Sequence, residues 1–188
     1  MPRSARSSLS YAAAGAVAAV LLAGCGGEEV GEKPDLPDET PALWNPCDVL
    51  DVRLVERAFG SVSTEAQGSE TAPECRFAPE EKSGQAVVSS NYTLFSGTLD
   101  EAWESMGQPD DADVTEPEIE GADAARIVVD VVREQLYVTG FVENGDLIQT
   151  VNVVDPAPYD EQQVLDGMRA TLAVLSRHAE KSGVEDSD

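Results

Sequence analysis

Apolar side chains recur with helical spacing in two segments of the chain. In residues 51–60, three of them fall on one face of a helix: Val52, Val55 and Phe59. Asp48 or Asp51 can cap the start of this helix, and Gly60 can end it, because glycine readily adopts the left-handed conformation found there. Residues 159–179 carry one apolar stripe along a longer helix, made by Val164, Leu165, Met168, Leu172 and Leu175. The pattern predicts a short helix early in the folded region and a long helix at its end.

Between these helices, polar and apolar residues alternate as they do in half-buried β-strands. We expect strands within residues 61–66, 74–78, 85–95, 122–132, 135–142 and 146–154. Cys75 and Phe77 are two positions apart and therefore point to the same face of their strand. Asn144-Gly145 separates the last two segments, and this dipeptide between alternating runs is a strong hairpin signal.

A further short helix is indicated by Thr98-Leu99-Asp100-Glu101, which has the spacing of a capping box. Its inward residues would be Leu99, Ala102, Trp103 and Met106. Residues 107–121 then form a long acidic loop. Together the elements predict one α+β domain over residues 44–181, a largely antiparallel sheet with the short N-terminal helix and the long C-terminal helix packed on it.

The start of the chain has a different pattern. Arg3 and Arg6 precede an uncharged, apolar stretch, residues 11–24. At 14 residues this stretch is too short to cross a bilayer core, which needs roughly 20, but it fits the apolar region of a secretory signal peptide. It ends in Leu22-Ala23-Gly24-Cys25, which resembles the bacterial lipobox. We therefore expect residues 1–24 to be a signal peptide and Cys25 to become a lipidated N-terminus on the extracytoplasmic face of the cell membrane.

Charge and composition change abruptly after Cys25. Residues 26–42 combine acidic side chains with glycine and proline, so we expect residues 25–43 to form a disordered acidic tether, and residues 182–188 a disordered tail. The formal charge is −24 for the whole chain, and removal of Arg3 and Arg6 with the signal lowers it to −26. Such acidity argues against nucleic acid as a partner, because nucleic acid is itself a polyanion.

Two cysteines remain in the predicted domain, Cys47 and Cys75. Outside the cytoplasmic membrane an even pair is most simply a disulfide. The alternatives are a redox pair, which would place the cysteines two residues apart, and a zinc site, which needs more ligands than the distant His178 supplies.

Short motifs around these cysteines resemble a known family. "NPCDVL", a helix that ends at Gly60, "CRF" and "EGADAAR" are similar to an actinobacterial lipoprotein family, domain of unknown function 3558, although Phe77 stands where tryptophan is more usual. The resemblance covers most of residues 44–178. It implies a cell-envelope lipoprotein and supplies no catalytic residues. The fold is also similar, more distantly, to extracytoplasmic sensor domains of mycobacterial kinases and to the PsbP/Mog1-like fold.

The sequence contains few motifs typical of reactive sites. The sequence has no Gly-x-Ser-x-Gly elbow, phosphate-binding loop or His-Glu-x-x-His motif, and His178 suits a helix C-terminus. Oxygen ligands for Ca²⁺ cluster in Asp110, Asp111, Asp113, Glu116, Glu118 and Glu120. Counted from Asp111, however, an EF-hand would need glycine at Glu116 and glutamate at Ala122, so a solvated acidic loop is the better interpretation.

The sequence therefore predicts no catalytic residues, metal or cofactor. We expect a non-enzymatic binding or accessory module of the cell envelope, held at the membrane through the lipid on Cys25, with an envelope protein or a small ligand as its partner. An extracytoplasmic small-ligand sensor or carrier is the alternative, and an envelope hydrolase comes third.

Cys25→Ala tests the anchor. The short apolar stretch cannot hold the chain as a membrane span, so the variant should leave the membrane fraction for the medium or the soluble fraction. Membrane fractionation followed by immunoblotting measures this. A variant that fractionates with membranes as tightly as the wild type would show that the lipobox interpretation is wrong.

Overall fold

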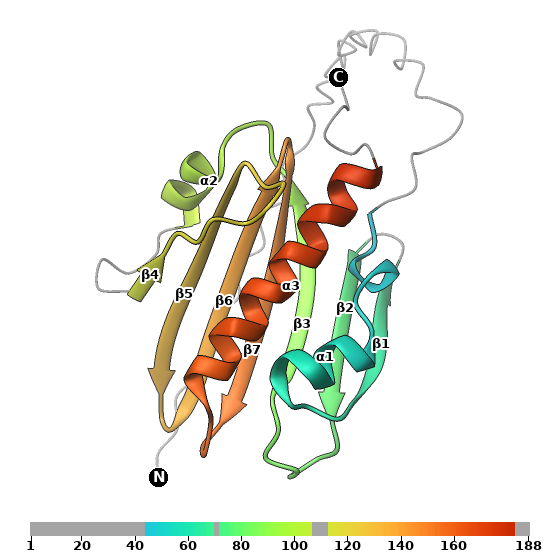
Figure 1. The fold of residues 1–188 in the computed structure, drawn as a ribbon, viewed down its shortest axis with the longest axis vertical. Coiled ribbons are helices and arrows are strands. Elements are labelled where there is room, and N and C mark those ends of the chain that lie inside the picture. Colours follow the sequence, from blue (N-terminus) through green and yellow to red (C-terminus); the bar gives the residue numbers. More distant parts are fainter. Residues whose placement is uncertain (1–43, 70–71, 107–112, 183–188) are drawn as a thin grey trace, which may run out of the picture. The chain divides into compact units, whose positions relative to one another are not determined.

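The structure, a computed structural model, describes residues 44–69, 72–106 and 113–182. The predicted signal peptide, Cys25, the tether up to residue 43 and the tail from residue 183 lie outside these residues. The described chain is built around an antiparallel sheet of seven strands in the order β1-β2-β3-β7-β6-β5-β4 (Figure 1). The predicted α+β class is confirmed, as is the long C-terminal helix packed on an antiparallel sheet.

The elements lie close to the segments that periodicity predicts. The strands are β1 (Ser63–Ser69), β2 (Ala72–Pro79), β3 (Val87–Leu94), β4 (Asp113–Thr115), β5 (Ala124–Val132), β6 (Gln135–Asn144) and β7 (Leu147–Pro156). The helices are α1 (Val52–Phe59), α2 (Leu99–Met106) and α3 (Glu161–Ser182), preceded by the 3₁₀ turn η1 (Pro46–Asp48). β4 is a correction, because it lies inside the segment that the sequence predicts to be a loop.

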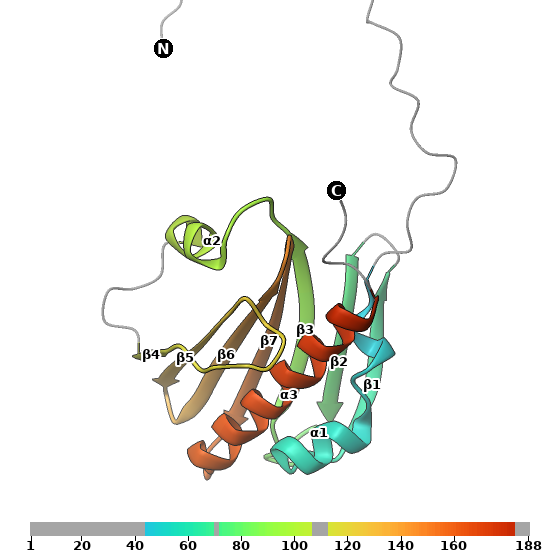
Figure 2. The same ribbon diagram turned by 45° about the horizontal axis from the view of Figure 1, so that its top comes forward.

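The sheet has an inner face, covered by α1 and α3, and an opposite face that carries α2 at one end (Figure 2). Alternation along the strands divides their side chains between the two faces. The inner face and α3 form the main core, in which the fully buried residues include Val88, Val138, Val151, Val153, Met168 and Leu172. Burial of each such side chain contributes about 1.5–3 kcal/mol, so this layer dominates the stability of the fold.

Two glycines allow the close approaches in this layer. A Cβ on Gly140 of β6 would overlap the sulfur of Met168, so the absence of a side chain lets α3 settle onto the sheet. A Cβ on Gly167 of α3 would overlap the carbonyl oxygen of Ala58, so it lets α1 and α3 cross closely. Neither glycine has a positive φ, and their role is therefore steric.

The predicted helix ends are confirmed by their hydrogen bonds. The Leu54 N–H donates to Asp51 Oδ1 at 2.7 Å, and Gly60 ends α1 with φ +68°. In the capping box of α2, the Glu101 N–H donates to Thr98 Oγ1 at 3.3 Å and the Thr98 N–H donates to Glu101 Oε2 at 3.0 Å. These bonds satisfy backbone donors that a helix start leaves unpaired.

Three apolar residues on the inward side of their helix or strand are exposed instead. Met106 is 41% exposed because α2 packs on Phe141 and Ile148 through Leu99 and Ala102, near its start. Leu94 is 60% exposed at the last position of β3, and Val52 is 38% exposed in the first turn of α1. In each case the periodicity is right, but the covering element does not extend to the end of the helix or strand.

The β5–β6 and β6–β7 hairpins both have tight two-residue loops. The sequence pattern does not predict the exact loop residues of either hairpin. Between β6 and β7 the loop residues are Gly145 and Asp146, because Asn144 is still paired with Leu147 and is buried. Between β5 and β6 they are Arg133 and Glu134, with φ of +52° and +63°. Such turns usually contain asparagine or glycine, and the absence of both explains why the pattern does not reveal this one.

Gly167→Ala tests the close crossing of α1 and α3. Alanine gains about 1 kcal/mol of helix propensity over glycine, but the added methyl must push Ala58 away, and overpacking costs typically 1–3 kcal/mol. We therefore expect a lower free energy of unfolding, measured by urea denaturation. An alanine variant as stable as the wild type or more so would show that the helices separate freely. Ala170→Gly, at an exposed position of α3, controls for propensity alone.

Candidate functional site

Arg126 is the best-connected charged residue that the structure describes. It extends from β5 beneath α2, and its side chain is only 13% exposed. Its Nη2 lies 2.7 Å from Asp100 Oδ1 and 3.0 Å from Glu116 Oε1, and its guanidinium carbon lies 4.8 Å from the centre of the Trp103 ring. Arg126 therefore joins α2 and the segment after β4 to the sheet, through two ion pairs and a cation–π contact.

Glu143 lies on the same face, at the start of α2. It is 6% exposed, and its Oε2 accepts a hydrogen bond from the Leu99 N–H at 3.0 Å. Burial raises the pKa of Glu143 above its ordinary value, the hydrogen bond from Leu99 opposes this, and the nearby carboxylates of Asp123 and Asp100 raise it further. Glu143 is thus a buried carboxyl group that caps a helix, at a cost in desolvation.

An open pocket of about 450 Å³ lies beside these residues, lined by Asp100, Glu116, Glu118, Asp123 and Arg126 among others. Four of these charged groups already have partners: Arg126 binds Asp100 and Glu116, and Asp123 Oδ2 accepts a hydrogen bond from the Gly145 N–H at 2.8 Å. The described residues that line the pocket include no serine, cysteine or histidine. The arrangement holds α2 in place and provides no nucleophile beside a base.

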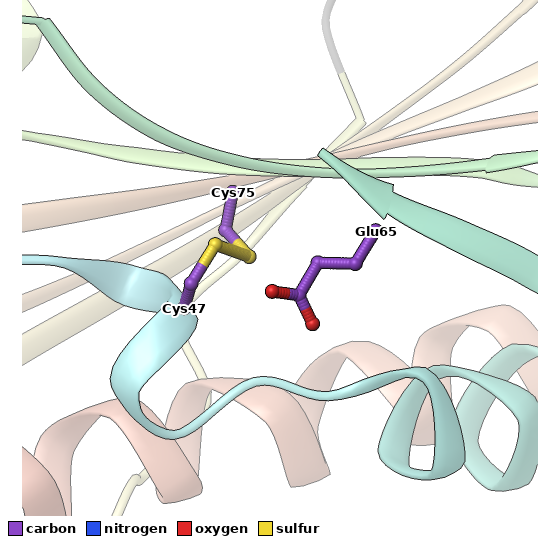
Figure 3. A group of neighbouring side chains, drawn as sticks. All are labelled: Cys47, Glu65 and Cys75. Atoms are coloured by element: carbon purple, nitrogen blue, oxygen red, sulfur yellow. A yellow bond between two sulfur atoms is a disulfide. The ribbon is translucent and has the colours of Figure 1, made fainter. Parts of the chain in front are cut away.

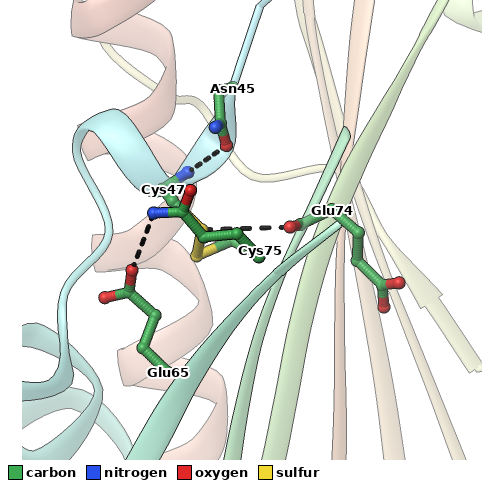
Figure 4. Close-up of a disulfide and its surroundings, with 6 residues drawn as sticks. Asn45, Cys47, Glu65, Glu74 and Cys75 are labelled. Atoms are coloured by element: carbon green, nitrogen blue, oxygen red, sulfur yellow. Dashed lines mark hydrogen bonds between the residues drawn. A yellow bond between two sulfur atoms is a disulfide. The ribbon is translucent and has the colours of Figure 1, made fainter. Parts of the chain in front are cut away.

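The predicted Cys47–Cys75 disulfide is confirmed, with Cα atoms 5.1 Å apart. It ties η1 to β2, and Cys75 is fully buried. The Cys47 N–H donates to Asn45 Oδ1 at 3.0 Å, and the sulfur of Cys47 lies 3.9 Å from the Glu74 carbonyl oxygen (Figure 4). With a separation of 28 residues, closing this loop stabilises the fold by about 3.5 kcal/mol in the chain-entropy treatment.

The carboxylate of Glu65 on β1 lies beside this disulfide (Figure 3). One ligand atom each of Glu65, Cys47 and Cys75 falls within 4.8 Å of the others. Sequence reasoning misses Glu65, because only the antiparallel pairing of β1 with β2 brings it next to Cys75. Arg126 and Glu143 are missed for the same reason, although an arginine in the apolar segment 122–132 is a signal for a buried ion pair.

Other residues that the sequence singled out are placed apart from these groups. His178 packs on Trp44 with ring centres 4.3 Å apart, and the Trp44 indole N–H donates to Gln149 Oε1 at 2.9 Å. In the acidic segment, Asp110 and Asp111 lie outside the described residues, while Asp113 is in β4 and Glu116 binds Arg126. Within the described ranges, no three carboxylates of this segment gather as ligands for one metal ion.

The exposed part of the sheet opposite α1 and α3 forms another candidate, which we call the outer face. It consists of outward residues of β3, β7 and β6 that are exposed or half-buried: Val87, Ser89, Asn91, Thr93, Gln135, Tyr137, Thr139, Thr150, Asn152, Val154 and Pro156. The strand register aligns Ser89, Asn152 and Thr139 in one row. The Thr139 hydroxyl donates to Asn152 Oδ1 at 3.1 Å, and the Tyr137 hydroxyl donates to Gln135 Oε1 at 2.8 Å.

Among the described residues, no helix is both long enough and apolar enough to span a membrane. No protein-family model, curated protein or solved structure matches the chain.

Glu143→Gln tests the buried carboxyl group. Because the pKa of Glu143 is raised in the folded state, the folded state binds this proton more tightly than the unfolded state. This carboxyl therefore makes wild-type stability rise as pH falls from neutral toward the ordinary value of 4.5. Glutamine can still accept the Leu99 N–H without a buried charge, so the variant should lack this part of the rise and be at least as stable at pH 7.

Urea denaturation at a series of pH values between 7 and 5 measures the effect. Glu118→Gln, at an exposed position of the same pocket, is the control and should keep the wild-type profile. Parallel pH profiles for Glu143→Gln and the wild type would contradict the assignment.

Proposed function

We propose that this protein is a lipid-anchored module of the cell envelope, displayed on the extracytoplasmic face of the membrane, and that it binds a partner through the outer face without catalysing a reaction. The signal peptide pattern, the lipobox at Cys25 and the resemblance to the lipoprotein family of domain of unknown function 3558 support the location. The disulfide is in keeping with an oxidising compartment.

The absence of charge on the outer face is the observation that carries the proposal. The chain has 36 acidic and 12 basic residues, yet none of the outer-face residues is charged. Charged side chains begin only at its borders, with Glu74 and Arg76 on β2 and Asp130 on β5. Net charge keeps proteins apart, so this is the surface on which another molecule meets the least repulsion.

The chemistry of the outer face also favours binding. Centres of protein–protein interfaces are depleted in charged residues and enriched in aromatic ones, and Tyr137 supplies an aromatic ring that is 36% exposed. Hydroxyl and amide groups on adjacent strands lie about 4.8 Å apart on a rigid sheet. They therefore lose little conformational entropy when they form hydrogen bonds with a partner. These features fit an envelope protein better than a nucleic acid.

The packing on the inner face gives less support to the alternative of a small-ligand carrier. A carrier would need a cavity with apolar walls and a few converging polar groups, for example between sheet and helix. Here Met168 and Leu172 of α3 press directly on Gly140 of β6. The described pocket beside Arg126 is open and lined by charged groups, and it lacks the constellation that an envelope hydrolase would use.

Photo-crosslinking in intact cells tests the outer face. Benzoylphenylalanine in place of Tyr137 keeps an aromatic ring on the outer face, and the same replacement of Tyr159, next to the start of α3, is the matched control. We expect a discrete cross-linked product with an envelope protein from position 137 that is absent from position 159. Thr139→Arg should abolish this product while lowering the free energy of unfolding by no more than about 1.5 kcal/mol, the contribution of the lost bond to Asn152. Equal cross-linking from both positions would contradict the proposal.

A further inference from the structure

The two disulfide cysteines and a neighbouring glutamate together form a set of possible metal ligands. Glu65, Cys47 and Cys75 come from β1, η1 and β2 and converge with their ligand atoms within 4.8 Å of one another (Figure 3). In the β1–β2 ladder, Glu65 pairs with Phe77 and Gln67 pairs with Cys75. Glu65 therefore lies diagonally across from Cys75 on the same face of the sheet, and its exposed side chain extends toward the sulfurs (Figure 3).

The orientation of Glu65 is supported by a second contact. Gln67 Nε2 donates to Glu65 Oε1 at 3.2 Å, and within the described ranges Glu65 Oε2 makes no hydrogen bond. Carboxylates that bind metals are commonly held by such a hydrogen bond to a neighbour. On the other side, Asn45 fixes the backbone of Cys47 through its 3.0 Å bond to the Cys47 N–H, so the turn that carries this sulfur is also held in place.

Two thiolates and one carboxylate are ligands that Zn²⁺ accepts, with a fourth position left for water. In the oxidised protein the sulfurs are bonded to each other and carry no negative charge, so they cannot serve as these ligands. We propose that Cys47, Cys75 and Glu65 form a site for Zn²⁺ or a similar thiophilic divalent ion when the disulfide is reduced, so that the same residues hold either a disulfide or a metal ion.

The chemistry of the exchange balances with a dithiol as the reductant. The dithiol gives two electrons and two protons to the S–S bond, which breaks to two thiols, and the dithiol closes to its own disulfide. Zn²⁺ then replaces the two thiol protons, which pass to solvent. The bound ion, two thiolates and carboxylate carry a net charge of −1.

Glu65 places a negative charge beside the two sulfurs, and this charge attracts a bound cation. The inference is independent of what the outer face binds, since the outer face lies on the opposite side of the sheet.

Metal titration of the full chain carrying Cys25→Ser tests the proposal, because Cys47 and Cys75 are then the only cysteines. A water-soluble phosphine reduces the disulfide, taking oxygen from water to form the phosphine oxide, and is removed without air before Zn²⁺ is titrated against a chromogenic chelator. We expect one Zn²⁺ per reduced chain and none per oxidised chain. Co²⁺ should give the absorption of a thiolate-bound tetrahedral ion.

Two glutamate variants distinguish Zn²⁺ binding by Cys47, Cys75 and Glu65 together from binding by the two thiols alone. Glu65→Gln should weaken Zn²⁺ binding to the reduced chain by at least about 10-fold, since even groups that only support metal ligands are worth 10–100-fold. Glu74→Gln should bind like the wild type, because Glu74 neighbours Cys75 in sequence but points to the opposite face. Equal affinity in Glu65→Gln and wild type would overturn the proposal, as would a reduced wild type that binds no Zn²⁺.

Circular dichroism on the same samples covers the case in which reduction unfolds the domain. Metal binding is then coupled to folding, so Zn²⁺ should restore the native spectrum of the reduced wild type. A reduced chain that stays unfolded in excess Zn²⁺ would also overturn the proposal.

Discussion

The contact between α3 and the inner face of the sheet is the interaction on which the rest of the structure depends. It buries the central strands along most of the helix, and it requires Gly140 to carry no side chain, while Gly167 allows α1 to cross α3 closely. With α3 seated there, α1 is fixed through its crossing with α3, and η1 and the disulfide are fixed in turn against β2. The central part of the inner face is thus committed to the core, and the outer face is the larger open part of the described sheet.

The side of the sheet opposite α1 and α3 is divided between two kinds of polar chemistry. At one end, Arg126 and Glu143 are used internally, to dock α2 and to cap its first turn. Over the central strands, neutral hydroxyl and amide groups face outward with few internal partners beyond the Thr139–Asn152 bond. On this side of the sheet, Arg126 and Glu143 are therefore used for contacts within the chain. The outward residues over the central strands are uncharged and accessible to solvent. This division supports a binding surface, whereas a catalytic centre would place titratable groups in the open region.

Periodicity and capping rules predict much of the fold, because they depend on residues close in sequence. Asp51, Gly60 and the pair Thr98–Glu101 can be assigned from the sequence alone, since each bonds within four residues of itself. The candidate sites depend on pairing between distant strands, and periodicity carries no information about which strands pair. The row that joins Ser89, Asn152 and Thr139 exists only because β7 lies between β3 and β6, and Glu65 meets Cys75 only through the β1–β2 register. The disulfide can be predicted without knowing which strands pair, because Cys47 and Cys75 are the two cysteines of the predicted domain and each can form a disulfide only with the other.

The position of β7 has a consequence for the order in which the chain can assemble. It is the last strand along the sequence, yet it lies at the centre of the sheet and is the only described link between β1-β2-β3 and β6-β5-β4. Until residues 147–156 have been made, these two groups of strands have no edge in common, and α3 follows later still. The hydrophobic core that the structure describes therefore cannot be completed before β7 and α3 have been synthesised. Long-range pairing of this kind slows folding.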